Sequence, residues 1–155
     1  MIYTLPEWEE RFIVDSEDDE GENWKFKASL AAAKSLYEKW RELYELVMAF
    51  TDTLPDEDDP ISTRELIYQN AMMVAPKILS AAGDTLYIIK MENASIIRTN
   101  CMQLMVQVIF STMMNTAARH HEQVIRDSMD EFKSLFREWT TTFVKDECDD
   151  EWGLF

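Results

Sequence analysis

The side chains that could hold a metal ion are scarce, and their spacing does not favour a metal site. The chain has only two histidines, the neighbours His120 and His121. Adjacent residues on a helix point about 100° apart, so the two imidazoles cannot easily share one ion. A di-iron bundle needs Glu-x-x-His on two helices, and alanine stands three positions before each histidine. We predict no metal site, although pairings of His121 with Glu122 or of His120 with Cys101 stay open.

The residues available for nucleophilic catalysis are equally few. Cys101 lies in a long apolar stretch, which predicts a buried, inert thiol. Cys148 stands among carboxylates rather than beside the positive charges that activate a thiolate. With three glycines in the chain, a glycine-rich phosphate loop is excluded. We predict no catalytic residue and no cofactor, and we lean toward a protein that is not an enzyme.

The composition indicates which elements must carry these residues. Three glycines and four prolines among 155 residues are too few for the many turns of a β-sandwich or barrel. Apolar residues instead recur every three or four positions, which is typical of core-facing helices. We predict an all-α, antiparallel four-helix bundle that forms one domain over residues 1–155. The predicted long helices cover residues 23–51, 62–82, 85–115 and 120–145.

Local signals suggest where these helices begin and end. Thr4 and Pro6 indicate a short N-terminal helix within residues 1–22. The run Ser62–Glu65 fits a capping box, in which the serine caps the helix and the glutamate reaches back. Gly83 and Asp84 indicate the end of one helix and the N-cap of the next. Pro76 predicts a kink, because proline removes a backbone donor inside a helix.

The net charge of −15 comes from three acidic runs that fall in predicted connections. They cover residues 15–22, 56–59 and 146–151. The bland interpretation is a set of solvated loops that keep the protein soluble. The charge argues against a nucleic acid partner, because the phosphates would be repelled. Cation binding by the loops, or a role as an acidic decoy for basic proteins, remains an alternative.

The predicted helix 85–115 is apolar around most of its circumference. A helix of this kind is normally covered on all sides, and one bundle leaves an outer side open. We therefore predict a homodimer or higher oligomer that buries part of this helix. The candidate self-association face consists of Ile97, Met105, Val108, Ile109 and Met113. Alternatively, Trp8, Phe12 and Ile13 of the N-terminal helix cover the same surface.

The C-terminal tail, residues 146–155, is acidic and then apolar to its end. Trp152, Leu154 and Phe155 follow three acidic residues. This tail is similar in kind to the acidic, Phe-terminated tips with which bacterial single-stranded DNA-binding proteins recruit partners, although it lacks a proline before the last Phe. The resemblance implies a protein partner for the tail. The competing expectation is that Trp152 and Phe155 fold back onto the bundle.

These observations predict a non-enzymatic interaction protein that self-associates. The alternative is a ligand-binding or enzymatic bundle with a pocket lined by Trp40, Tyr44, Met105 and Trp139. No apolar run reaches the length of about 18 residues that spans a membrane, and the N-terminus lacks a basic and then apolar leader pattern. We therefore expect a cytoplasmic protein with no membrane partner.

Overall fold

The computed structural model describes residues 4–11, 23–55, 62–115 and 118–155. Helices make up 79% of these residues, and none of them is in a strand. The all-α class is therefore confirmed. The helices are α1 (Trp8–Arg11), α2 (Asn23–Asp52), α3 (Thr63–Ala82), α4 (Tyr87–Met114) and α5 (Arg119–Thr141).

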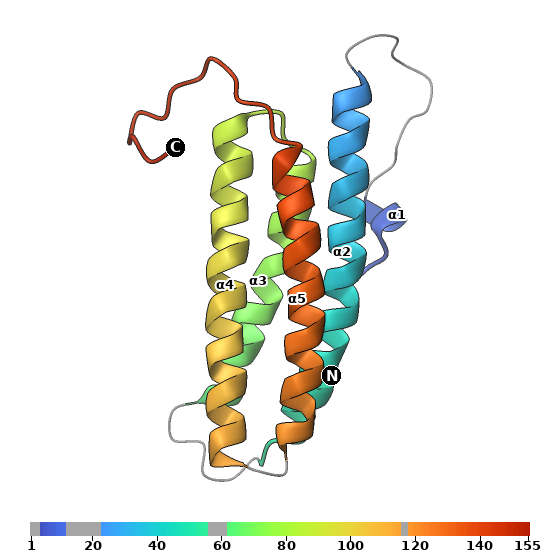
Figure 1. The fold of residues 1–155 in the computed structure, drawn as a ribbon, viewed down its shortest axis with the longest axis vertical. Helices are drawn as coiled ribbons and strands as arrows, with labels where there is room; N and C mark the ends of the chain where they lie inside the picture. The colour runs from blue at the N-terminus through green and yellow to red at the C-terminus, as the bar shows by residue number, and fades with distance from the viewer. Residues whose placement is uncertain (1–3, 12–22, 56–61, 116–117) are drawn as a thin grey trace.

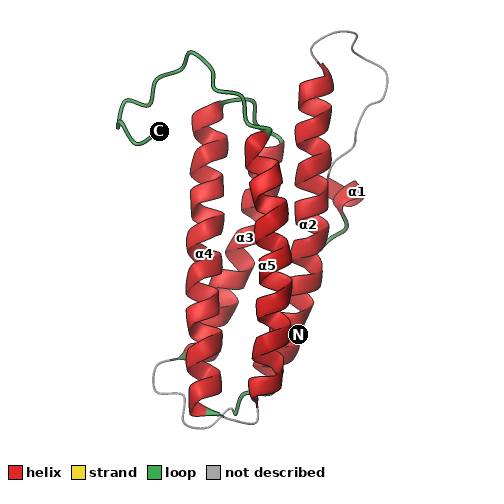
Figure 2. Ribbon diagram, viewed as in Figure 1, coloured by secondary structure: helices red, strands yellow, loops and turns green. Residues whose placement is uncertain are grey.

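The four long helices α2 to α5 alternate in direction, which gives the predicted antiparallel bundle (Figures 1 and 2). Around the bundle the order is α2, α3, α4 and α5, so that α2 and α4 lie on a diagonal. The packing is unequal, because α3 contacts α4 extensively whereas α5 leans on α2 and touches α4 much less. The seam between α4 and α5 is therefore the most weakly packed edge.

Aromatic side chains fill the core between α2 and α5. Trp40 meets the Phe132 ring edge-on at a centroid distance of 5.5 Å. Near the C-terminal end of α5, the Trp139 ring packs against the rings of Phe136 and Phe143, at centroid distances of 5.8 Å and 4.8 Å. Both tryptophans are fully buried. The contact between Trp40 and Phe132 joins α2 to α5, while the contacts of Trp139 extend the aromatic cluster along α5.

The ends of the long helices only partly follow the sequence signals. Ser62 is the N-cap of α3, but its φ of 53° is left-handed and its side chain makes no capping bond. The predicted capping box is therefore wrong, because a capping serine needs an extended backbone. The partner residue Glu65 accepts a hydrogen bond from Gln69 instead, at 3.1 Å. Gly83 does end α3, and its N–H donates to the Leu79 carbonyl at 3.2 Å.

The start of α4 is held by two carboxylates. Asp84 accepts the Leu86 N–H at 2.8 Å, and Asp146 accepts the Tyr87 N–H at 3.0 Å. Leu86, which occupies the N-cap position, has no side chain that could do this. The tail that follows α5 thus returns to the beginning of α4 and satisfies one of its free backbone donors.

Two further expectations concern a kink at Pro76 and a break before the last long helix. Pro76 lies on the exposed side of α3, and the helix continues through it to Ala82. Proline leaves the carbonyl four residues earlier without a backbone donor, and water can replace that donor because this side of the helix is exposed. The predicted break before α5 is present, since α4 ends at Met114 and α5 begins at Arg119.

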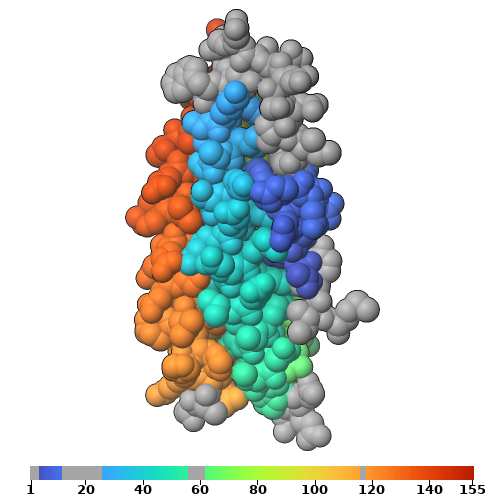
Figure 3. Space-filling model, turned by 90° about the vertical axis from the view of Figure 1, so that its right-hand side faces the viewer, coloured from blue at the N-terminus to red at the C-terminus, as the bar shows by residue number. Residues whose placement is uncertain are grey.

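The described part of the N-terminal segment contains α1 and packs beside α2. Leu5 and Trp8 are buried, and the Tyr37 hydroxyl donates to the Pro6 carbonyl at 2.7 Å. Figure 3 shows this segment lying along the surface of α2. On the exposed side, Lys34 and Glu9 form an ion pair at 2.7 Å. Phe12 and Ile13, the other two residues predicted to cover the bundle, lie outside the described residues.

Candidate functional site

An apolar groove runs along the weakly packed seam between α4 and α5. Its volume is about 280 Å³. Met102, Met105 and Val106 line it from α4, and Met129, Phe132 and Phe136 line it from α5. The groove exists because the helices separate where flexible methionines face the aromatic side chains of α5. Methionine adapts its shape to different contacts, which is a property of many protein-binding surfaces.

The charged residues that line the groove are both basic. Arg98 lies on its α4 wall and Lys133 on its α5 wall. The Lys133 ammonium is 3.3 Å from the Asp130 carboxylate, in an exposed pair. Exposed pairs of this kind are weak, so Lys133 can still attract a second anion. In a chain of charge −15, both charged residues that line this apolar groove are basic, although Asp130 offsets part of the Lys133 charge.

Cys101 also lines this groove. Its side chain is buried, and burial raises the pKa of the thiol to about 12. The thiol is therefore protonated at neutral pH and behaves as a small apolar group, as the sequence predicted. The Cys101 thiol therefore adds to the apolar lining of the groove.

Next to the groove, the outer face of α4 exposes a row of large apolar side chains. We call Met102, Val106, Phe110 and Met113 the α4 outer face; all four are exposed, and Met113 shows 70% of its surface to solvent. Their spacing of four, four and three residues places them on one side of a helix. Met102 and Val106 belong both to this face and to the groove wall, so the two surfaces are continuous.

Two of the five residues in the predicted self-association face are not available at the surface. Ile97 and Val108 are completely buried within their own bundle, and they cannot contact a second chain. Met105 and Ile109 are half-buried, while Met113 is exposed. The two buried residues share a side of the helix with Cys101 and Leu104, which also belong to the core. The surface left open lies on the opposite side.

The N-terminal segment does not cover the α4 outer face. The segment lies against α2, and a cavity beside Leu5 and Pro6 is completed by α3 residues such as Met72 and Leu79. In Figure 1, α1 is on the side of α2 that faces away from α4. For the described part of the segment, the alternative that it shields α4 is wrong.

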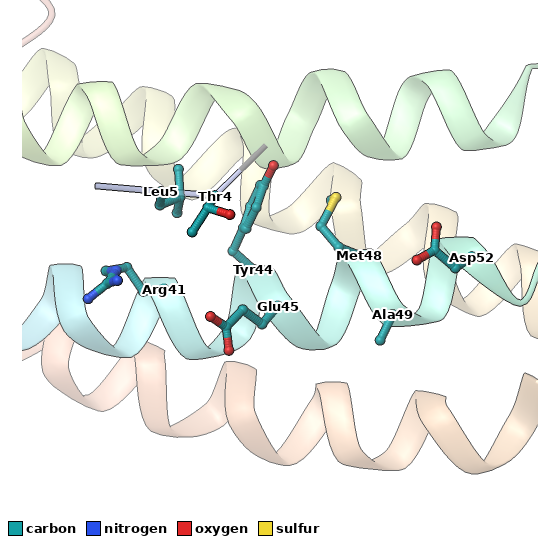
Figure 4. A pocket seen from close by; sticks show the side chains of 8 residues that line it. All are labelled: Thr4, Leu5, Arg41, Tyr44, Glu45, Met48, Ala49 and Asp52. Atoms are coloured by element: carbon teal, nitrogen blue, oxygen red, sulfur yellow. The ribbon is translucent and has the colours of Figure 1, made fainter. Parts of the chain in front are cut away.

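The predicted aromatic ligand pocket is not formed as a single cavity. Trp40 and Trp139 are fully buried in the core, Met105 lines the α4–α5 groove, and Tyr44 lines a different hollow. That hollow, of about 310 Å³, lies where residues 4–5 meet α2. Figure 4 shows Tyr44 in this hollow together with the charged residues Arg41, Glu45 and Asp52 of α2.

The tail ends in a compact turn that displays its apolar residues. Asp150 accepts the backbone N–H groups of Trp152 at 3.0 Å, Leu154 at 2.6 Å and Phe155 at 3.1 Å. These backbone hydrogen bonds lower the pKa of Asp150. Trp152 is 94% exposed and Leu154 is 71% exposed. Trp152 therefore does not fold back onto the bundle, whereas Phe155, the other residue of that expectation, is half-buried.

Lys90 is a buried lysine that the sequence patterns did not single out. Its ammonium lies 3.3 Å from the Ser29 hydroxyl oxygen and 5.4 Å from the centre of the Phe143 ring. Desolvation lowers the pKa of Lys90, although the carboxylate of Asp84 partly opposes the shift. No local motif marks a lysine that is buried by residues from distant helices.

The histidine pair lies at the start of α5. His120 is exposed and His121 is half-buried, with 5.9 Å between the ring centroids and His121 6.3 Å from the Phe50 ring. Within the described ranges, no three histidine, cysteine or carboxylate side chains gather as metal ligands would. Of the acidic runs, the first two lie outside the described residues, and the third supplies the Asp146 and Asp150 contacts.

Comparison with known proteins adds no family to this picture. No protein-family model, no curated protein and no solved structure matches the chain. Among the helices that are described, none combines the length and apolarity needed to cross a bilayer. The groove, the α4 outer face and the tail are therefore the features that bear on function.

Proposed function

We propose that the protein is a non-catalytic interaction protein that associates with a second copy of itself. The observation that carries this proposal is the α4 outer face, which exposes four large apolar side chains next to an apolar groove. Contiguous apolar patches of this kind on soluble proteins are typical of protein-binding surfaces. Covering the patch with a second copy would remove it from water.

The way α4 distributes its polar residues supports the same proposal. Lys90, Asn93, Ser111 and Thr112 face the core and are buried. Asn93 and Ser111 donate to carbonyls of α4 itself, at 2.9 Å and 2.8 Å. α4 thus exposes large apolar side chains and buries several polar ones beside the apolar Ile97, Leu104 and Val108, a distribution unlike that of an ordinary surface helix. This distribution is expected if the outer side of α4 is also buried in an assembly.

The test is the dimer dissociation constant, measured by sedimentation equilibrium near physiological salt. Phe110→Glu places a charge on the α4 outer face without disturbing the core, because Phe110 is already exposed. We expect this variant to dissociate at least ~10-fold more easily, as for loss of a central aromatic contact. Ser35→Glu adds the same charge on the exposed side of α2 and should change nothing. A wild-type protein that stays monomeric at high concentration would refute the proposal.

A further inference from the structure

The tail and the groove of this protein have matching chemistry. The groove has an apolar lining of methionine and phenylalanine bordered by Arg98 and Lys133. The tail carries Asp149, Asp150 and Glu151 directly before Trp152, Leu154 and Phe155. Positive charge at the border and negative charge beside the apolar residues favour encounter and fix orientation. From this complementarity we propose that the C-terminal tail of one copy docks into the α4–α5 groove of a second copy.

The size of the groove suits a short peptide segment. Its volume of about 280 Å³ lies near the lower end of the range for small-ligand sites, roughly 300–1,000 Å³. A whole helix would not fit between α4 and α5 unless they moved apart. A few side chains from an exposed tail fit without that movement. Trp152 and Leu154 are the tail side chains with the greatest exposure.

The tail is also prepared for this contact before binding. The Asp150 carboxylate fixes the backbone of Trp152, Leu154 and Phe155, and the Gly153 N–H donates to the Asp150 carbonyl at 2.9 Å. Gly153 has a φ of 67°, a left-handed conformation that glycine adopts without strain. A segment that is already ordered loses less conformational entropy when it binds.

The ordered turn of the tail, rather than its length, favours a second copy over the chain's own groove. The bond from Asp146 to the Tyr87 N–H holds the base of the tail at the start of α4. Arg98, the nearest groove residue, is eleven residues along α4, or about 16 Å at 1.5 Å per residue. The six residues from Asp146 to Trp152 reach about 20 Å only if fully extended. Docking in the same chain would therefore reach the groove's edge and would require the Asp150 turn to open.

This inference rests on the proposed self-association and adds to it the contact that holds the two copies together. If each tail enters the partner's groove, the two contacts are equivalent and close a two-fold symmetric dimer. The α4 outer face adjoins the groove, so it would lie beside the docked tail. The experiment must therefore separate a tail contact from a contact that uses the outer face alone.

The first set of variants removes one side of the contact at a time. Trp152→Ala changes an almost fully exposed side chain, so the fold should be unaffected and the dimer dissociation constant should rise at least ~10-fold. Arg98→Glu with Lys133→Glu should have a similar effect. Combining this reversed groove with Asp149→Lys and Glu151→Lys should restore much of the affinity, and Asp150 stays unchanged because it organises the turn. Ser35→Glu again serves as the control.

The second set asks whether the tail acts between chains. A chain lacking residues 152–155 keeps its groove, and the chain with Arg98→Glu and Lys133→Glu keeps its tail. Each alone should be monomeric, while a mixture should form a one-to-one dimer, measured by sedimentation equilibrium. Failure of the mixture to associate would overturn the proposal.

Two other outcomes separate this inference from the proposed function. If Trp152→Ala leaves the dimer intact while Phe110→Glu breaks it, self-association stands and the tail contact is refuted. If the wild-type protein stays monomeric at high concentration, neither the tail nor the α4 outer face joins two copies. That result would overturn both proposals.

Discussion

Lys90 carries a positive charge into the bundle without a carboxylate hydrogen-bond partner among the described residues. It contacts the hydroxyl of Ser29 and faces the Phe143 ring. Ser29 does not depend on Lys90, because the Thr142 hydroxyl is also within hydrogen-bond distance of Ser29, at 2.9 Å. Burying a charge without a close ion-pair partner costs stability. The lowered pKa of Lys90 is the electrostatic sign of that cost.

Replacing Lys90 with methionine should therefore stabilise the protein. We expect Lys90→Met to raise the free energy of unfolding at pH 7 by about 1 kcal/mol, measured by urea denaturation. Because the pKa is lowered in the folded state, the folded protein releases this proton before the unfolded chain does. The stability of the wild type relative to the variant should thus rise as the pH approaches the ordinary lysine value of 10.5.

The exposed Lys145 supplies the control for that measurement. Lys145→Met should leave the free energy of unfolding within about 0.5 kcal/mol of the wild type. A less stable Lys90→Met variant would show that the contact with Phe143 outweighs the loss of hydration.

At the scale of elements, the start of α4 depends on a residue from the far end of the chain. Asp146→Ala removes the acceptor for the Tyr87 N–H, and we expect it to lower the free energy of unfolding by about 1 kcal/mol, as for loss of a helix cap. Asp146→Asn keeps an oxygen acceptor and should retain most of that stability. Asp149→Ala, an exposed change in the same tail, is the matched control. Equal stability of Asp146→Ala and the wild type would show that water replaces the carboxylate.

The long helices could be predicted from the sequence because their apolar residues repeat at helical spacing over many turns. The orientation of α4 could not, because apolar residues occupy both of its sides. Ile97, Leu104 and Val108 form one row, and the α4 outer face forms another with almost the same spacing. Which row is buried depends on α3, which packs along one side of α4. Sequence periodicity contains no information about that partner.

The helix ends and the groove could not be predicted from the sequence, for related reasons. Ser62 adopts a left-handed backbone, so the residue types of a capping box are present without its geometry. Asp146 supplies a bond to Tyr87 across a distance in sequence that no local motif covers. The groove arises from the separation of α4 and α5, and its basic border joins Arg98 and Lys133 from different helices. The tail residues were recognisable because they are contiguous in the chain.

For the molecule as a whole, the unequal packing predicts unequal stability of the helices. α5 is held mainly by α2, through the contact between Trp40 and Phe132 and an ion pair between Lys39 and Glu131, which raises the pKa of Lys39. α3 packs against both of its neighbours. We expect native-state hydrogen exchange of the monomer to show α5 opening at a free energy at least ~1 kcal/mol below that of α3. Identical opening energies would mean that the bundle unfolds as one cooperative unit.

The attachment of the tail to α4 also decides how the protein would respond to a mechanical load. A pull on the C-terminus meets the bond from Asp146 to the Tyr87 N–H before it meets the last turn of α5. The next restraint is the contact between Thr142 and Ser29, which ties the end of α5 to α2. The load is therefore shared by α4, α2 and α5, and α5 does not unwind alone. A tail bound to another molecule could be strained without immediately unwinding the helix from which it emerges.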